Sequence, residues 1–589
     1  MSSNAVASRA GYNRFLLLVA GLGGLLYGID VGIIGGALPY LEATSGLNAG
    51  ELSIIVAAVL LGSVFSTLFA GMLADWMGRR ALMILSGTSF VISIPVIALS
   101  HGYGPLFFGR LLQGISGGFI GVVVPLYLAE CLVASTRGKG TGVFQWLLTL
   151  GIVAAALIGI YYSYRVEEVA RSASAAALFA FKDQAWRRIF WVSLPPGVLF
   201  VAGAFLVAES PRWLFKKGRR EAAYSALLRS RAPEEADREL HEMQETAQAN
   251  LSRGAAIRES LLQRKYVVPF VLACIVLFCN TACGINSIIG YNTNILLQSG
   301  LSDVQAHWGY VIFTVVNFLM TIIGLTLVDR KGRRFLLITG TAGIIVSLTV
   351  TALLFLGTEK SNIDVHDRLQ SAIQPDQTLS VRFDPAQAAQ LLGAESRIDP
   401  AKASLVVVYS YGDFTAESTV AHSNEEGAPV IHVSRESAVP ANKIEAFFKN
   451  PFADVTAART APLKIEKALV SPLPDASHGW LVAITLYIFM SFYAIGPGVC
   501  VWLALSELMP TRIRSNGMSI ALVINQMVST TLAAIFLPIV ANHGYSTIFF
   551  LFAGFTVIYF VTATFFLPET KGKTLEEIEE YFEGAKASA

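Results

Sequence analysis

The sequence DWMGRR at residues 75–80 recurs as DRKGRR at residues 329–334, and each copy lies between two long apolar runs. After each copy come a glutamate and an arginine seven positions apart, and each half then ends with a further glutamate; these residues are Glu130, Arg137 and Glu209 in the first half, and Glu507, Arg514 and Glu569 in the second. Two copies of one charged framework in an apolar chain indicate a duplicated membrane bundle. In carriers built this way the substrate site lies near mid-membrane, where the repeats meet.

The composition agrees with a membrane protein. Hydrophobic residues make up 54% of the 589-residue chain and charged residues 15%, which is too apolar for a soluble protein of this length. A helix that crosses a bilayer needs about 20 mostly apolar residues. We predict twelve such runs, at residues 15–38, 52–74, 81–100, 105–129, 141–163, 188–208, 267–297, 307–328, 334–357, 480–505, 515–540 and 546–567.

Loop charges predict the orientation of these helices. The basic segments at residues 75–80, 137–140, 212–265, 329–334 and 511–514 and the C-terminal tail all fall on one side. By the positive-inside rule that side is cytoplasmic. We therefore expect a multi-pass protein of the cytoplasmic (inner) membrane with both termini in the cytoplasm. The first apolar run is longer than a signal-peptide core, so we expect it to remain as a membrane anchor.

The second half contains a polar segment, residues 358–478, that the first half lacks. Its position between the ninth and tenth runs places it outside the cell. Several of its stretches have the composition of strands (residues 378–384, 404–414 and 428–434) or of short helices that begin at a proline (residues 385–394 and 440–450). The segment is therefore predicted to form a small α+β domain. A smaller excess in the first half is assigned to a polar loop near residues 164–185.

These boundaries divide the chain into an N-terminal six-helix half, a cytoplasmic linker, helices seven to nine, the extracytoplasmic insertion, helices ten to twelve and a cytoplasmic tail, at residues 1–211, 212–265, 266–357, 358–478, 479–567 and 568–589. The five cysteines and the histidines of the insertion lack metal-ligand spacing, and no hydrolase motif is present. We expect no metal, no cofactor and no catalytic residue, so the chain is not predicted to be an enzyme.

Asp30 is a charge in the middle of the first apolar run, LLYGIDVGIIGG at residues 25–36. An ionised carboxylate at that depth costs several kcal/mol unless it meets water or a cation, so it is a functional candidate. Arg110, at the start of the fourth run, is the expected partner in the same half. A carboxyl group that either binds a proton or pairs with arginine can couple protons to transport. The alternative is a structural ion pair that fixes the helix register.

The charged framework lies at the predicted cytoplasmic ends of the helices. Salt bridges between these ends would hold the carrier open to the outside and break on inward opening, whereas the alternative is solvated loop charge. The matched spacing in both halves favours a cytoplasmic gate made of Asp75, Arg79, Arg80, Glu130, Arg137, Glu209, Arg212, Asp329, Arg333, Arg334, Glu507, Arg514 and Glu569.

Polar side chains inside the apolar runs mark a substrate pathway. Amides both donate and accept hydrogen bonds, which suits uncharged polyhydroxyl ligands, and Trp502 can stack on a sugar ring. Each of these residues can instead join two helices by a hydrogen bond. The predicted sugar-binding residues are Gln145, Asn280, Thr281, Asn286, Asn317, Trp502, Asn525 and Gln526.

The same motifs resemble the sugar porter family of the major facilitator superfamily. They are DWMGRR, PLYLAE followed by RGKG, ESPRWL, GIN at residues 284–286, DRKGRR, WLALSE and PETKGKTLEE, and they cover nearly the whole chain except 358–478. The resemblance implies a twelve-helix carrier of monosaccharides in two pseudo-symmetric halves, without covalent chemistry. By motif position it also implies that Gln145, Asn286, Asn317, Trp502 and Asn525 contact the sugar, and that Asp30 and Arg110 match the acid and arginine of the bacterial proton/monosaccharide symporters.

The chain departs from the family pattern at four places. Asn280-Thr281 replaces a glutamine pair, Gly290-Tyr291 replaces a tyrosine pair, Gln526 replaces an aromatic residue, and Ile152 replaces a glutamine of some pentose carriers. These changes alter the size and the hydrogen-bonding groups of the site. The identity of the sugar or polyol is therefore open.

The sequence predicts proton-coupled symport of a monosaccharide, a hexose, a pentose or a related polyol, into the cell by alternating access. The alternatives are a facilitative uniporter and a sugar receptor that does not transport. The expected partners are the sugar, the proton and the lipid bilayer, with an extracytoplasmic partner of residues 358–478 as a further option; no nucleic acid is expected. We expect a monomer.

Overall fold

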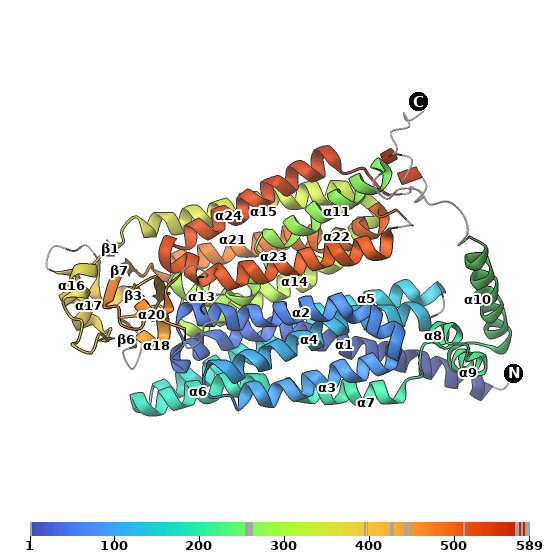
Figure 1. The fold of residues 1–589 in the computed structure, drawn as a ribbon, viewed down its shortest axis with the longest axis horizontal. Helices are drawn as coiled ribbons and strands as arrows, with labels where there is room; N and C mark the ends of the chain where they lie inside the picture. Colours follow the sequence, from blue (N-terminus) through green and yellow to red (C-terminus); the bar gives the residue numbers. More distant parts are fainter. Residues whose placement is uncertain are drawn as a thin grey trace.

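The computed structural model places two helical bundles side by side, with a small mixed domain at one end (Figure 1). We call this end the insertion end, and the opposite end, which carries α8 (Pro211–Lys216), α9 (Arg220–Ser230) and α10 (Pro233–Arg253), the linker end. The structure describes residues 3–132, 134–253, 263–393, 396, 398–424, 429–440, 446, 450, 453–510, 513–571, 577–578 and 581–582, without the side chains of 3–8, 134–141, 246–253, 329, 502–507 and 514–516.

Six spans form the first half. Their helices are α1 (Ser3–Ser45), α2 (Ala49–Met77), α3 (Arg79–Ala98), α4 (Tyr103–Cys131), α5 (Ala134–Ala170), and α6 (Ala175–Trp191) continued by α7 (Leu194–Leu206). The start of α2 is capped locally: the Asn48 side chain accepts from the Glu51 amide at 2.9 Å and the Glu51 carboxylate accepts from the Asn48 amide at 3.0 Å. The predicted loop near residues 164–185 is wrong, because α5 and α6 extend through most of it.

The second half contains two broken spans. The seventh divides into α11 (Arg264–Ala282), α12 (Ile285–Gly290) and α13 (Asn292–Gln298), and the tenth into α21 (Ala476–Ile495) and α22 (Pro497–Leu508). The remaining spans are α14 (Asp303–Lys331), α15 (Arg333–Glu359), α23 (Arg514–His543) and α24 (Tyr545–Val561), which a π-type turn extends to Phe566. In all, twelve helical segments of the described chain are long and apolar enough to cross a membrane, which confirms the predicted number.

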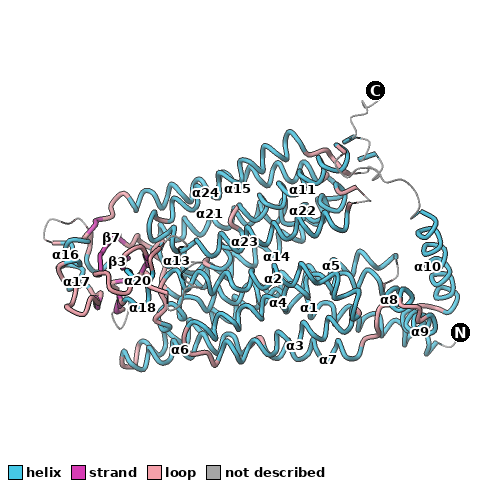
Figure 2. Tube along the Cα trace, viewed as in Figure 1, coloured by secondary structure: helices cyan, strands magenta, loops and turns pink. Residues whose placement is uncertain are grey.

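The strands of the insertion are grouped at one end of the molecule (Figure 2), and the insertion has its own hydrophobic core. One sheet has the strand order β1-β7-β3-β4 with β5 also paired to β3, and a second pairs β2 with β6, all antiparallel. The strands are β1 (Ile363–Asp364), β2 (Leu379–Arg382), β3 (Ala403–Tyr411), β4 (Phe414–Glu417), β5 (Ala421–His422), β6 (Val430–Val433) and β7 (Leu463–Pro472). The short helices are α16 (His366–Gln370), α17 (Pro385–Leu392), α18 (Arg435–Ala438) and α20 (Val455–Ala458), with a 3-10 turn at Pro400–Lys402.

The predicted α+β insertion is therefore confirmed. The valine-rich run of β3 is almost wholly buried and pairs along its length with β7, a strand that the sequence analysis missed. β7 alternates polar and apolar residues at its start, where its polar face is exposed. Most of the helix expected at residues 440–450 lies outside the described residues.

The insertion contacts both halves of the bundle. The Asn48 amide group in the first half donates to the Ser437 carbonyl at 2.8 Å, and the Asn542 amide group in the second half donates to Glu417 at 3.0 Å. At its C-terminal boundary, Lys402 Nζ lies 2.8 Å from Asp475, and this hydrogen bond lowers the pKa of the Asp475 carboxyl group. The domain therefore lies across the junction between the halves.

We predict that the bundle folds without the insertion. Replacing residues 360–477 with a short Gly/Ser linker should give a monodisperse, folded protein, because the insertion has a separate core and because α15 and α21 are joined directly by the Thr351 and Thr485 hydroxyl groups at 2.8 Å. Size-exclusion chromatography and thermal unfolding in detergent measure this outcome. An aggregated deletion protein would contradict it, and a folded deletion protein that binds no sugar would show that the insertion forms part of the sugar site.

Candidate functional site

The charged framework of the first half is assembled at the linker end. The Arg79 guanidinium lies 2.9 Å from both Asp75 and Glu130, which joins α2, α3 and α4. The Glu209 carboxylate, which follows α7, accepts from the backbone amides of Arg79 at 2.9 Å and Arg80 at 3.1 Å. Glu209 thus closes the six-helix half onto the start of α3.

The repeat has the same geometry in the second half. Gly78 and Gly332 separate two helices with φ values of 101° and 88°, which a residue with a side chain rarely adopts. Each break exposes the first amides of the next helix, where a carboxylate is favoured. Glu569 accepts from the amides of Arg333 and Arg334 at 3.1 and 3.2 Å, as Glu209 does in the first half.

These described bonds join helices of the same half. Arg212 is exposed at the start of α8. The side chains of the other four predicted gate residues, Arg137, Asp329, Glu507 and Arg514, lie outside the described residues.

Asp30 and Arg110 lie inside the first half, and each is 1% exposed. The Asp30 carboxyl group packs against Gly117 of α4, where an added Cβ would lie 2.8 Å from Oδ2. Arg110 donates to Gln113 at 2.7 Å and lies over the Phe190 ring, 5.5 Å from its centroid. Asp30 and Arg110 interact electrostatically, but neither Asp30 oxygen has a described hydrogen-bond partner. The structure thus brings the predicted pair into one buried region without forming a described salt bridge.

Four of the predicted sugar-binding residues lie where the broken seventh span meets α23. The breaks fall at Cys283-Gly284 and at Tyr291, so Asn280 and Thr281 end α11 and Asn286 begins α12. The Thr281 hydroxyl donates to the Asn525 carbonyl at 3.2 Å, and the Asn525 amide group donates to the Leu277 carbonyl at 2.8 Å.

Two further contacts surround this junction. Asn286 donates to Ser529 at 2.6 Å, and the Asn280 side chain donates to the Tyr493 hydroxyl at 3.4 Å, while the side-chain oxygen Oδ1 of Asn280 has no described partner. Polar groups are therefore concentrated at helix breaks inside the membrane-spanning part, an arrangement that transporters use to contact substrates and ions.

The other predicted sugar-binding residues are half-buried. Gln145 on α5 and Asn317 on α14 are sequence neighbours of Trp146 and Phe318, whose rings lie 5.6 Å apart across the two halves. Gln526 on α23 is also half-buried. The Trp502 side chain lies outside the described residues.

The sequence analysis missed the contact between the halves at the insertion end. Asp303, at the start of α14, accepts from Tyr40 of α1 at 2.8 Å and from Ser163 of α5 at 2.5 Å. The Tyr310 hydroxyl on α14 donates to the Gly32 carbonyl at 2.8 Å, and Thr293 on α13 donates to the Gly35 carbonyl at 2.6 Å. These bonds hold the halves together on the side of the insertion.

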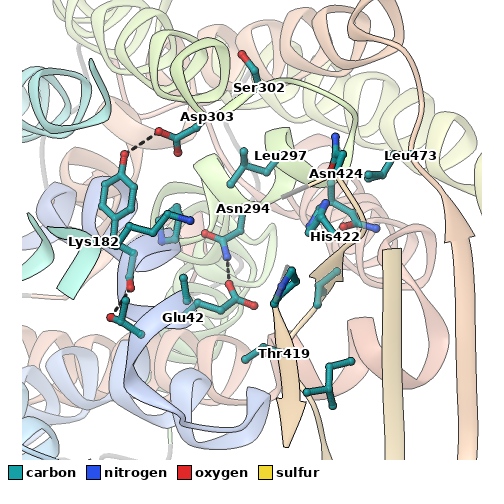
Figure 3. Close-up of a pocket in the computed structure, with 18 of the residues that line it drawn as sticks. Glu42, Lys182, Asn294, Leu297, Ser302, Asp303, Thr419, His422, Asn424 and Leu473 are labelled. Carbon is teal, nitrogen blue, oxygen red and sulfur yellow. Dashed lines mark hydrogen bonds between the residues drawn. The ribbon is translucent and has the colours of Figure 1, made fainter. Parts of the chain in front are cut away.

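A cavity of about 920 Å³ lies between this contact and the insertion (Figure 3). Its lining combines Glu42 of α1, Lys182 of α6 and Asn294 of α13 with Thr419 and His422 of the insertion. None of the seven predicted sugar-binding residues whose side chains the structure describes lines it. The cavity is therefore distinct from the predicted sugar site.

Twelve membrane-length helices in two halves with matching charged breaks define a membrane transporter of the major facilitator type. Residues 16–369 and 463–582 match the family described as "Sugar (and other) transporter", and the chain belongs to that family.

The chain is similar to several proteins named as transporters. The chain is 27% identical to the glucose transporter GlcP of Staphylococcus epidermidis over 96% of its length and 97% of the relative. It is 27% identical to the human proton myo-inositol cotransporter, over 95% of this chain and 80% of the relative. The proton:xylose symporter XylE, solved with 6-bromo-6-deoxy-D-glucose, superimposes with a TM-score of 0.61 at 20% identity, over 98% of this chain and all of that chain. The superposition with XylE shows that the two proteins share a fold.

We predict that the carboxylates at the helix breaks stabilise the two halves. Glu209→Gln should lower the free energy of unfolding by about 1–2 kcal/mol, because it removes a charge that faces two helix-start amides. Glu569→Gln should have a similar effect in the second half. Thermal unfolding in detergent measures both, with Glu221→Gln at the exposed start of α9 as the matched control. Unchanged unfolding of both break variants would contradict the interpretation.

Proposed function

We propose that the protein imports a monosaccharide or related polyol together with a proton, by alternating access between its two halves. The observation that carries the proton coupling is Asp30, a fully buried carboxyl group without a described hydrogen-bond partner in a sugar-transporter fold. The relatives named as glucose, proton myo-inositol and proton:xylose carriers support both the substrate class and the coupling. The proposal includes no covalent reaction.

Asp30 is the proposed proton carrier. Binding a proton removes an unpaired charge from an apolar region, which lowers the cost of moving the site between the two faces of the membrane. Arg110 is held nearby by Gln113 and the Phe190 ring, and it provides the positive charge with which the deprotonated carboxylate pairs in another state. Asp30 then has two states: it is either protonated and unpaired, or deprotonated and paired with Arg110.

The proposed sugar site lies where the broken seventh span meets α23, and we assign Gln145 of the first half to it. Asn286 and Asn525 offer amide groups at this junction, and the side-chain oxygen Oδ1 of Asn280 is a further acceptor. Such groups exchange hydrogen bonds with the hydroxyl groups of a sugar when the site is loaded. We also assign Asn317 and Trp502 to this site on the basis of the motif positions.

The linker end is proposed to face the cytoplasm, because it carries the repeated arginine-rich segments. The insertion and the contact between Asp303 and Tyr40 then lie on the outer side. We retain the charged framework as a proposed cytoplasmic gate, with one change: the bonds of Arg79 to Asp75 and Glu130 are formed while the outer side is closed, so these two bonds are not the ones that break on inward opening. Within each half the framework bonds hold the helix ends together at the linker end. These linker ends of the two halves approach one another when the outer side opens.

The insertion is proposed to have a modulatory or docking role at the outer mouth. Its contacts with Asn48 and Asn542 fall on opposite halves, so movement of the halves changes those contacts. A carbohydrate of the cell wall is a suitable partner class for a domain in this position.

The first functional prediction separates symport from facilitated diffusion. In proteoliposomes with an imposed pH gradient, the protein should accumulate sugar against its gradient, and a protonophore should abolish the accumulation. Asp30→Asn should abolish accumulation while sugar exchange persists, because the amide cannot carry the proton.

Asp376→Asn is the matched control, since Asp376 is exposed in the insertion. Accumulation by the Asp30 variant would overturn the coupling role. Exchange without accumulation by the unmodified protein would indicate a uniporter, and binding without any flux would indicate a receptor.

A second prediction concerns the sugar site. Gln145→Ala, Asn286→Ala and Asn317→Ala should each weaken sugar binding by about 1–3 kcal/mol, because each leaves partner groups unpaired in a desolvated site. Trp502→Ala should cost at least as much through lost stacking. Calorimetry across a panel of hexoses, pentoses and polyols first identifies the ligand and then measures each variant.

Thr485→Val is the matched control, because it removes a buried hydroxyl group that joins α21 to α15 away from this junction. Unchanged affinity in all four variants would place the sugar site elsewhere.

A further inference from the structure

His307 lies in the contact between the two halves at the insertion end. It is on the second turn of α14 and is 0% exposed. Its Nδ1 atom lies 2.9 Å from the Asp303 carbonyl oxygen and 3.4 Å from the Asp303 carboxylate. Its Nε2 atom lies 3.2 Å from the carbonyl oxygen of Gly36 in the other half. Both ring nitrogens therefore face oxygens that only accept hydrogen bonds.

This arrangement selects one protonation state. A neutral imidazole has one N–H donor and one nitrogen lone pair. Either neutral tautomer would direct its lone pair at a carbonyl oxygen, in a buried site where an unmade hydrogen bond is costly. The imidazolium donates from both nitrogens, to Asp303 on one side and to Gly36 on the other. The geometry thus fits the cation.

Asp303 supplies the matching negative charge. Its carboxylate accepts from Tyr40 at 2.8 Å and from Ser163 at 2.5 Å, and both hydroxyl groups belong to the first half. Figure 3 shows the Asp303 side chain with its dashed contact at the edge of the cavity. Hydroxyl donors from α1 and α5 stabilise the ionised form of a carboxyl group, as the imidazolium does.

The pocket for the imidazole exists only while three helices are together. The Tyr40 ring of α1 stacks on it, with centroids 5.6 Å apart and planes 9° apart. An added Cβ on Gly159 of α5 would lie 3.3 Å from His307 Cδ2 and 3.0 Å from the Gly36 Cα. Separation of the halves removes the Gly36 acceptor, the Tyr40 ring and both hydroxyl donors together.

We propose that His307 is a second proton-binding site, which takes up a proton when the insertion end closes and releases it when that end opens. The proposal rests on the proposed alternating access but not on the identity of the sugar. Linkage gives the direction of the pH dependence. The closed form binds the extra proton more tightly, so a lower pH favours closure of the insertion end and a higher pH favours its opening. An acidic exterior then resists reopening of the empty outer side.

The titratable groups around the imidazole are consistent with assigning the extra proton to His307. Asp303 and Tyr40 are the titratable groups with described contacts to the imidazole. Glu42 of α1, Glu167 of α5 and Lys182 of α6 line the adjacent cavity with Asp303. Asp30 is held separately, against Gly117 of α4 in the first half.

The protonation state is tested by ¹⁵N NMR of histidine-labelled protein in lipid nanodiscs. The chain has eight histidines, and the resonances of His307 are those missing from His307→Gln. At pH 7.5 without sugar they should be those of an imidazolium. Neutral-imidazole resonances in protein that is closed at the insertion end would overturn the proposal, whether or not the protein transports sugar.

The linkage is tested by pulsed electron spin resonance between nitroxides carried by unnatural amino acids at two exposed positions, 172 after α5 of the first half and 360 at the end of α15 of the second half. The short-distance, closed population should fall as the pH rises from 5.5 to 8.5, and His307→Gln should abolish this dependence. Glutamine retains a donor toward Gly36 but does not titrate in this range.

Two controls separate this proposal from the proposed function. Tyr40→Phe should lower the closed population at every pH while its pH dependence remains, because the stacked ring stays and a hydroxyl donor is lost. Asp30→Asn should keep the pH dependence even though it abolishes sugar accumulation. An unchanged pH dependence in His307→Gln would overturn the linkage, and its loss in Asp30→Asn instead would assign the proton to Asp30.

Discussion

A helix that starts at a buried position leaves its first backbone amides without partners unless another group accepts from them. Gly78 and Gly332 end α2 and α14, and the exposed amides that follow are taken up by Glu209 and Glu569. Each carboxylate comes from the last part of its own half. In each half, the bond between a carboxylate and the first amides of a helix therefore both permits the sharp turn and ties the end of the half to that helix.

The same constraint gives the proposed sugar site its chemistry. The seventh span breaks at Gly284, which has a φ of 86°, and polar side chains of α11 and α12 lie on either side of the break. Thr281 and Asn525 use their hydrogen bonds to join α11 to α23, while Asn286 bonds Ser529. The break in the seventh span therefore lies beside the amide and hydroxyl side chains that are assigned to the proposed sugar site.

Contact between the halves depends on close backbone approach. Gly35 leaves room for the Tyr310 ring, and Gly159 for the His307 ring, so both side chains of α14 reach α1 carbonyl groups. Those carbonyl groups belong to an unbroken helix, so the proposed opening of the outer side requires no unwinding of α1. The insertion spans the same junction through Asn48 and Asn542, which links its position to the state of the two halves.

The sequence by itself determined the twelve spans, the duplication and the α+β insertion, because hydropathy, charge and glycine placement are local properties that repeat. It also indicated Asp30, whose charge is anomalous in any apolar run. Only the tertiary structure decided that β7 pairs with β3, that the predicted gate bonds form within each half, and that His307 meets Gly36. Asp303 and His307 are one helical turn apart in the chain, but their function as a pair depends on acceptors and donors more than a hundred residues away, whose proximity no local pattern encodes.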